Sequence, residues 1–315
     1  DQVRQNERHK NNDSIQRTGA KGFWDEVFEN ELNGLVKIAG EEYDASNYKA
    51  AVKSGLYDFT SARDFYREIT KAAGIGMHAE SLRRYIELQA LMVTVVAPHW
   101  AEHIWLEVLK KSDTVQNAIF PEAPAQKPEL TAAREYVRST QSNITSGEGA
   151  QLKKMAKGKQ TSYDPKKEKK LSIFAALSYP KWQDDVIEVV RQNFKDMKLD
   201  VGGVSKSIPK TESKRAMPFV QGLKKSLETG IEPSTVFERK LAFDEVKVLK
   251  EMVPGLKQTI QKCAAVEVIV VNQGGKSGNV VGGSEGVNEG EERAELPQVA
   301  ENAVPGQPTF FFENA

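Results

Sequence analysis

Apolar side chains recur every three or four residues through the first third of the chain, and this spacing restricts that third to helices. The run FWDEVFENELNGLVKIAGEEY places them along one helical face, and YKAAVKSGLYDFTSARDFYREIT repeats the pattern. Further helices are expected over about residues 78–96 and 99–110. Successive helices are separated by residues that interrupt helices, Gly74, Gly76 and Pro98. Long helices with short connections predict an antiparallel helical bundle over residues 22–125.

The second half of the chain has a different pattern. Three prolines in FPEAPAQKPE mark a boundary, after which a helix and a lysine-rich linker are expected over residues 126–170. LSIFAALSY and AAVEVIVVN are continuous apolar runs of strand length, and TFFFEN suits a last strand. Helical patterns lie between them, at about residues 182–194, 214–229 and 233–262. The chain is therefore expected to be mostly α, with a small α+β domain over residues 171–315 after the bundle.

Two segments lack any periodic pattern. Residues 1–21 are polar and are expected to be a disordered lead-in. Residues 273–297 are rich in glycine and glutamate and are expected to form a mobile loop. GGKSG at the start of this loop resembles the end of a phosphate-binding loop, but Val270 stands where the full motif requires glycine. We therefore interpret GGKSG as a flexible turn.

Composition excludes several classes of protein. Hydrophobic residues make up 39% and charged residues 28%, and no stretch approaches the ~20 apolar residues of a membrane span. The N-terminus has no apolar core like that of a signal peptide. The single cysteine, Cys263, excludes an internal disulfide framework. We expect a cytoplasmic chain with no membrane partner.

The net charge of zero hides an uneven distribution. Residues 126–225 contain 21 Lys or Arg and 11 Asp or Glu, whereas residues 281–315 contain seven Glu and one Arg. The densest basic segment is KKMAKGKQTSYDPKKEKK, residues 153–170, with eight lysines. It is either a solvated linker or a surface that contacts nucleic-acid phosphates. Arginines on the bundle helices also fit either ion pairing or RNA contact: Arg63, Arg67, Arg83 and Arg84.

A second pattern suggests a metal site. His99, Glu102 and His103 match the H-x-x-E-H pattern of inverted zinc peptidases. No third ligand is evident, and Pro98 just before His99 is a common way to begin a helix. We therefore favour a helix start that packs two bundle helices together, so that His99→Ala is expected to weaken folding. A zinc hydrolase is the less favoured alternative.

Several segments resemble a known family. RYIELQALMVTVVAPHWAEHIWLEVL resembles the anticodon-binding helical bundle of class I aminoacyl-tRNA synthetases. Six further segments, in the expected order, are similar to the C-terminal part of eukaryotic cytosolic leucyl-tRNA synthetases of fungal type. They are FENELNGLV, NYKAAVKSGLYDFTSARDFYRE, TVQNAIFPEAP, KRAMPFVQGLKK, VFERKLAF and VAENAVPGQP. The resemblance covers residues 22–315.

This resemblance implies an enzyme of which the chain is a C-terminal fragment. The family joins leucine to its tRNA in the cytoplasm with ATP and Mg²⁺. Neither of the family's two nucleotide-binding signatures occurs here, and no editing segment does either. The chain alone is therefore expected to be inactive, with no catalytic residue, metal or cofactor of its own.

The implied role of this part is to hold the body and long variable arm of tRNA(Leu), without DNA as a partner. We assign that surface to ten residues: Lys153, Lys154, Lys157, Lys159, Lys166, Lys167, Lys169, Lys170, Lys214 and Arg215. The first alternative is a helical scaffold for protein interactions, and the sequence leaves room for protein contacts through the C-terminal region. A related valyl or isoleucyl synthetase shares the bundle, but the segments after residue 170 favour leucyl.

Overall fold

The computed structural model describes residues 16–161, 163–195, 198–229, 232–272 and 274–315. The chain forms two compact units. The first comprises Asp1–Ala150 and Val248–Cys263, and the second comprises Gln151–Lys247 and Ala264–Ala315. This division differs from the expected domain boundaries. Most of the helix expected after residue 126 belongs to the same unit as the bundle, and so do residues 248–263 from the second half of the chain. None of the described helices is both long and apolar enough to cross a membrane.

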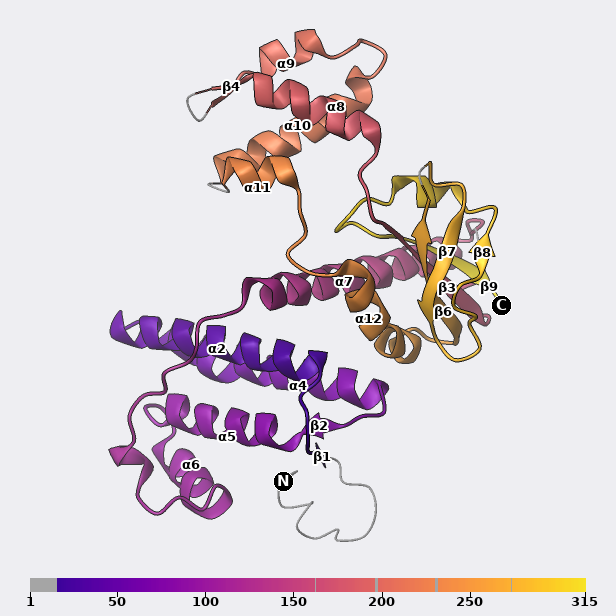
Figure 1. Cartoon of the computed structure of the whole chain (residues 1–315). Helices are drawn as coiled ribbons and strands as arrows, with labels where there is room; N and C mark the ends of the chain where they lie inside the picture. Colours follow the sequence, from indigo (N-terminus) through magenta and orange to yellow (C-terminus); the bar gives the residue numbers. More distant parts are fainter. Residues whose placement is uncertain (1–15, 162, 196–197, 230–231, 273) are drawn as a thin grey trace. The chain divides into compact units, whose positions relative to one another are not determined.

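The first unit is the helical bundle. Its helices are α2 (Phe23–Asp44), α3 (Tyr48–Val52), α4 (Phe59–Ala72), α5 (Ala79–Val93), α6 (Pro98–His103) and most of α7 (Pro128–Ala156) and α12 (Glu245–Thr259). Two π-helical turns, η1 (Lys53–Asp58) and η2 (Ile104–Val108), extend α3 into α4 and lengthen α6, and η3 (Val115–Asn117) is a 3-10 turn. Helices α2, α4 and α5 lie side by side (Figure 1). The predicted bundle is confirmed.

Stacked aromatic rings form the centre of the bundle. Phe28 of α2 stacks on Tyr66 of α4 with ring centroids 4.3 Å apart, and Phe59 stacks on Tyr85 of α5 at 5.0 Å. All four rings are buried. Burying a side chain of this size contributes about 1.5–3 kcal/mol, so the helical spacing of these residues drives the helices together. Gly255 of α12 comes so close to α4 that an added Cβ would lie 2.4 Å from Ile69.

The expected lead-in is partly structured. Residues 1–15 lie outside the described residues. Strand β1 (Gln16–Arg17) pairs in parallel with β2 (Met77–His78), and Arg17 forms an ion pair with the fully buried Asp25. The sequence does not show this, because a two-residue strand has no periodicity and its partner lies about 60 residues later.

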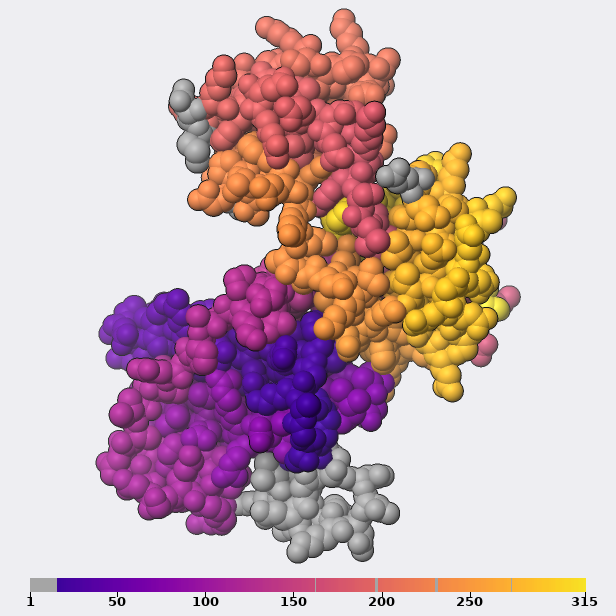
Figure 2. All heavy atoms as spheres, viewed as in Figure 1, coloured from indigo at the N-terminus to yellow at the C-terminus, as the bar shows by residue number. Residues whose placement is uncertain are grey.

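The second unit contains a five-stranded sheet in the order β8–β7–β6–β3–β9. The strands are β3 (Lys169–Ala176), β6 (Cys263–Val271), β7 (Gly278–Gly283), β8 (Glu292–Arg293) and β9 (Thr309–Asn314), and a 3-10 turn η4 (Gln298–Asn302) precedes β9. Strand β9 runs antiparallel to β3, and β7 runs antiparallel to both β6 and β8. In Figure 2, residues 263–315, which carry β6 to β9, are gold to yellow, whereas β3 comes from the magenta part of the chain.

The expected mobile loop at 273–297 is wrong in part, because β7 and β8 belong to that sheet. GGKSG is the turn between β6 and β7, with left-handed backbone at Gly274 and Gly275. The glycine-rich sequence of β7 has little β propensity of its own. Its strand conformation depends on the neighbouring strands, with which it forms hydrogen bonds.

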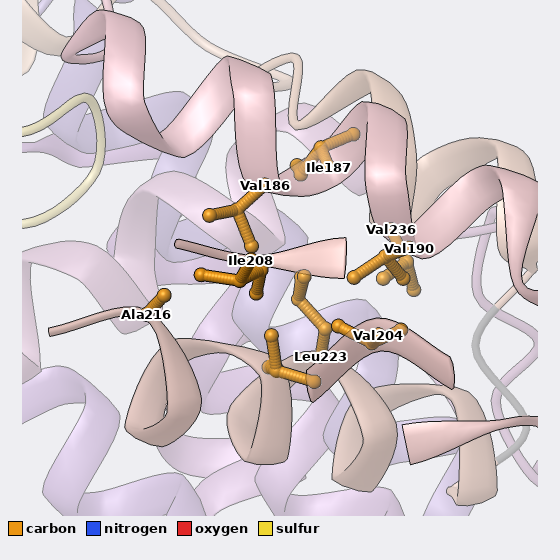
Figure 3. Close-up of a cluster of buried hydrophobic side chains, with 9 residues drawn as sticks. Val186, Ile187, Val190, Val204, Ile208, Ala216, Leu223 and Val236 are labelled. Carbon is orange, nitrogen blue, oxygen red and sulfur yellow. The ribbon is translucent and has the colours of Figure 1, made fainter. Parts of the chain in front are cut away.

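A small helical cluster is inserted between β3 and α12. It consists of α8 (Lys181–Gln192), the hairpin β4 (Phe194–Lys195) and β5 (Lys198–Leu199), α9 (Val201–Ser207), α10 (Ser213–Glu228) and α11 (Pro233–Glu238). Its core is aliphatic, and Val186, Val190 and Val204 point toward one another there (Figure 3). The single helix expected at 233–262 is wrong: Arg239 adopts a left-handed conformation with φ +51° and ends α11. The Arg239 guanidinium lies 3.7 Å from the centroid of the Tyr179 ring.

Candidate nucleic-acid interface

Four of the predicted binding lysines surround the C-terminal end of α7. Lys153 and Lys154 are in its last turn, and Lys157 and Lys159 follow directly; all four side chains are exposed. Gly158, with φ +69°, follows the helix in the left-handed conformation that commonly ends helices. Cations at this end also interact favourably with the helix dipole. The end of α7 therefore presents four exposed ammonium groups over seven residues.

Two more lysines lie on a tight turn just before β3. The Lys167 amide donates to the Asp164 carbonyl at 3.2 Å, and the Lys166 amide donates to the Asp164 carboxylate at 2.9 Å. Pro165 occupies the second position of this turn, where its fixed φ is favourable. Both lysine side chains are exposed. The turn therefore adds two cations to the basic surface of the second unit.

The assignment of Lys169 and Lys170 is corrected by the structure. Both belong to β3, which begins two residues before the predicted strand. Lys169 is completely buried, and its Nζ donates to the Pro165 carbonyl at 3.2 Å. Lys170 lies 2.9 Å from Glu267 and 3.6 Å from Glu313. Both lysines thus stabilise the sheet, and neither ammonium group is presented to a phosphate.

The partner of Lys170 is an unusual buried carboxylate. Glu267 of β6 is 3% exposed, accepts a hydrogen bond from Ser172 at 2.7 Å and lies 3.3 Å from Arg293 of β8. Burial by itself would raise the pKa of Glu267. The hydrogen bonds from Ser172 and Lys170, with the charges of Lys170 and Arg293, overcome that effect and lower its pKa below the usual value. Glu267 is therefore an ionised cross-link between three strands.

The last two predicted residues lie on a different element. Lys214 and Arg215 are exposed in the first turn of α10. The Arg215 guanidinium lies 4.2 Å from the centroid of the Trp182 ring, a cation–π contact that orders its side chain. Lys206 and Lys210 precede them and are also exposed. These residues form a second basic position in the same unit.

The arginines of the bundle have structural partners. Arg63 and Arg67 pair with Asp64 at 2.6 and 3.1 Å, and Arg83 donates to the Leu109 carbonyl at 2.9 Å. Arg84 donates to Asn33. Of the two interpretations open from the sequence, these contacts favour intramolecular pairing over RNA contact.

The histidine pattern is not a metal site in this structure. His99 and His103 are exposed on α6, and Glu102 accepts a hydrogen bond from the Val115 amide at 2.8 Å. Within the described part of the chain, no group of three His, Cys, Asp or Glu side chains is placed to hold a metal ion. Pro98 begins the helix, and in the segment that follows Trp105 is buried, whereas Trp100 of the helix is exposed. Because His99 is exposed, the structure gives no packing reason for His99→Ala to weaken folding.

No sequence motif singles out Asn314, although its side chain contacts the turn that carries Lys166 and Lys167. Its Oδ1 accepts from the Asp164 amide at 2.9 Å, across 150 residues of sequence. Its Nδ2 donates to the carbonyls of Asp164 and Glu168 at 2.9 and 3.1 Å. No sequence pattern links an asparagine at the end of a strand to such a distant turn. The pairing of β9 with β3 creates this contact.

Comparison with known proteins shows what the chain is similar to. Residues 25–162 match the family model described as the anticodon-binding domain of tRNA ligase. The chain is 46% identical over 308 residues to the cytoplasmic leucine–tRNA ligase of Neurospora crassa, covering 96% of this chain. It is 42% identical over 304 residues to that of Saccharomyces cerevisiae and 38% identical over 305 residues to the putative one of Schizosaccharomyces pombe, covering 95% of this chain in each case. The chain spans 27% of the length of each of these relatives.

Proposed function

Because the chain belongs to the leucine–tRNA ligase family, we propose that it is the tRNA-binding C-terminal portion of a cytoplasmic ligase that joins leucine to tRNA(Leu). The observation that carries this proposal is the similarity over nearly the whole chain to three such ligases. We assign leucine activation, with its ATP and Mg²⁺, to parts of the ligase outside this chain. The chain alone is then expected to bind tRNA without aminoacylating it.

The six exposed lysines between Lys153 and Lys167 are the main proposed contact with the RNA. Lysine side chains at a nucleic-acid backbone displace condensed counterions, and they do so without reading sequence. Folded RNA is held largely through its shape and its phosphates, which suits contacts to the body and variable arm of a tRNA. Lys214 and Arg215 provide the second proposed contact.

Salt-dependent binding tests the proposal. The purified chain is titrated with a tRNA(Leu) transcript at several salt concentrations, and log K should fall linearly with log salt, with a slope of about −0.7 to −0.9 per phosphate contact. A chain with alanine at Lys153, Lys154, Lys157 and Lys159 should bind more weakly and with a shallower slope. The matched control replaces four exposed lysines of the bundle, Lys37, Lys49, Lys53 and Lys71. Equal losses in both variants would argue against the proposed surface.

Specificity for leucine tRNAs needs a separate comparison. A tRNA with a long variable arm is expected to bind more tightly than one with a short arm, because we assign the proposed protein surface to contact with that arm. Equal affinity would remove the leucine-specific part of the proposal. Failure to bind any tRNA at moderate salt would instead favour a protein scaffold, with the C-terminal region as its contact.

A further inference from the structure

The turn that carries Lys166 and Lys167 is held by a side chain far away in the sequence. Asn314 is the last residue of β9, opposite Lys169 in the β3–β9 register. The turn, Asp164–Glu168, leads directly into β3 at Lys169. The Asn314 side chain therefore lies at the end of the ladder, where backbone pairing stops and the turn begins.

The hydrogen bonds of Asn314 join the two ends of the turn. The side-chain carbonyl accepts from the Asp164 amide, and the side-chain amide donates to the carbonyls of Asp164 and Glu168. The backbone amide of Ala315 also donates to the Glu168 carbonyl, at 3.0 Å. One asparagine thus bonds three backbone groups of the turn, of which the Asp164 amide has this side chain as its acceptor while the two carbonyls also accept from the Lys167 and Ala315 amides.

The base of the turn is attached to the sheet by further contacts. The Tyr163 ring stacks on Phe312 of β9, with centroids 5.3 Å apart and planes 22° apart. The buried Lys169 donates to the Pro165 carbonyl. The turn therefore has a fixed backbone, from which the exposed side chains of Lys166 and Lys167 project.

We propose that Asn314 is a positioning residue of the RNA-binding surface: it holds the Asp164–Glu168 turn so that Lys166 and Lys167 meet RNA phosphates as a preorganised pair. This inference rests on the proposed function of the chain. Ordering a flexible segment costs free energy when a ligand binds, and a segment ordered in advance avoids that cost. Asn314 acts only through the two lysines, since its own polar atoms are used by the turn.

A double-mutant cycle measures this dependence. We compare the affinity of a tRNA(Leu) transcript, at one moderate salt concentration, for the full chain and for three variants: Asn314→Ala, Lys166→Ala with Lys167→Ala, and all three changes together. Asn314→Ala should raise Kd about two- to tenfold, the loss expected when one or two side chains must be ordered on binding. In the background without the two lysines, the same change should have no effect. Asn279→Ala, an exposed asparagine of β7 in the same sheet, is the matched control and should leave Kd unchanged.

Amide hydrogen exchange and a second variant also test the positioning role of Asn314. Amide hydrogen exchange at Asp164 and Lys167 should accelerate in Asn314→Ala while the β6 amides stay protected. If Asn314→Ala does not fold, Pro165→Gly loosens the same turn without removing a side-chain hydrogen bond and should also raise Kd.

Unchanged affinity in a folded Asn314→Ala chain, or an equal loss with and without the two lysines, overturns the positioning role. So does unchanged affinity in Pro165→Gly when that variant has to replace Asn314→Ala. Absence of tRNA binding by the unaltered chain instead contradicts the proposed function itself.

Discussion

The hydroxyl of Tyr66 donates a hydrogen bond to the carboxylate of Asp25, and both residues are buried in the helical bundle, 1% and 0% exposed. The same carboxylate accepts the Gly22 amide at 2.6 Å and pairs with Arg17, and the Tyr66 oxygen accepts the His78 amide at 2.7 Å. Burial and the Asp25 hydrogen bond raise the pKa of Tyr66, so the hydroxyl remains a donor. This network fixes the chain where it enters α2.

Removal of the Tyr66 hydroxyl should destabilise the bundle. Tyr66→Phe removes the donor to Asp25 Oδ1 and the acceptor of the His78 amide, although Asp25 Oδ2 keeps Gly22 and Arg17. We therefore expect a loss of about 1–3 kcal/mol in the free energy of unfolding. Tyr57→Phe is the control, because Tyr57 is 65% exposed. Urea unfolding of both variants measures the difference. Similar stability would mean that water replaces the lost hydroxyl.

The ion pairs of Glu267 predict a loss of stability in acid. Its lowered pKa means that the folded sheet favours the ionised form, so the pairing stabilises the protein above the ordinary pKa of 4.5. That contribution should disappear as the pH falls through the lower pKa of the folded state. Thermal unfolding should show Glu267→Gln less stable than the unaltered chain at neutral pH, with a difference that shrinks below pH 4.5. A difference independent of pH would contradict this assignment.

Gly275 should not tolerate a side chain. Its φ is +71°, and an added Cβ would lie 2.5 Å from the Glu301 Cα. The left-handed backbone alone costs about 1–2 kcal/mol for alanine, and the contact with backbone adds to it. Gly274→Ala is the control, since its added Cβ meets no heavy atom within 4 Å. Chemical denaturation should show the larger loss for Gly275→Ala, and equal losses would place the cost in backbone strain alone.

Two residues of the zinc-like pattern, Glu102 and His99, should differ in their effect on stability. Glu102→Ala removes the acceptor of the Val115 amide, and we expect a loss of about 1 kcal/mol in stability. His99→Ala changes an exposed side chain and should have little effect. Thermal melts with and without a chelator compare the two variants. A melting temperature that falls on chelation of the unaltered chain would restore the metal interpretation.

Lysines on either side of the start of β3 should affect different properties. Lys170→Ala removes a partner of the buried Glu267 and should lower stability by about 1–3 kcal/mol. Lys154→Ala changes an exposed side chain, so it should leave stability intact and reduce the salt slope of RNA binding by about one unit. Parallel unfolding and binding titrations measure both quantities. A large loss of stability in Lys154→Ala would contradict its assignment to the surface.

The sequence alone was sufficient where the signal is local and repeated. The apolar spacing of α2, α4 and α5 predicted the bundle, because a helix with one apolar face has to bury it. The continuous apolar run AAVEVIVVN predicted β6, because a run of that length suits a buried strand. The ordered set of quoted segments also indicated the family, since such a set depends only on the linear order of residues.

Contacts between distant segments decided the rest. Lys169 and Lys166 look equivalent in a lysine run, yet one is completely buried and the other is exposed, because β9 pairs with β3 and determines where the strand begins. Glycine-rich β7 is a strand because β6 and β8 supply its hydrogen bonds, and part of α12 joins the bundle from the second half of the chain. Burial and pairing are properties of neighbours in space. Only the tertiary structure could therefore separate the lysines that stabilise the sheet from those exposed to solvent.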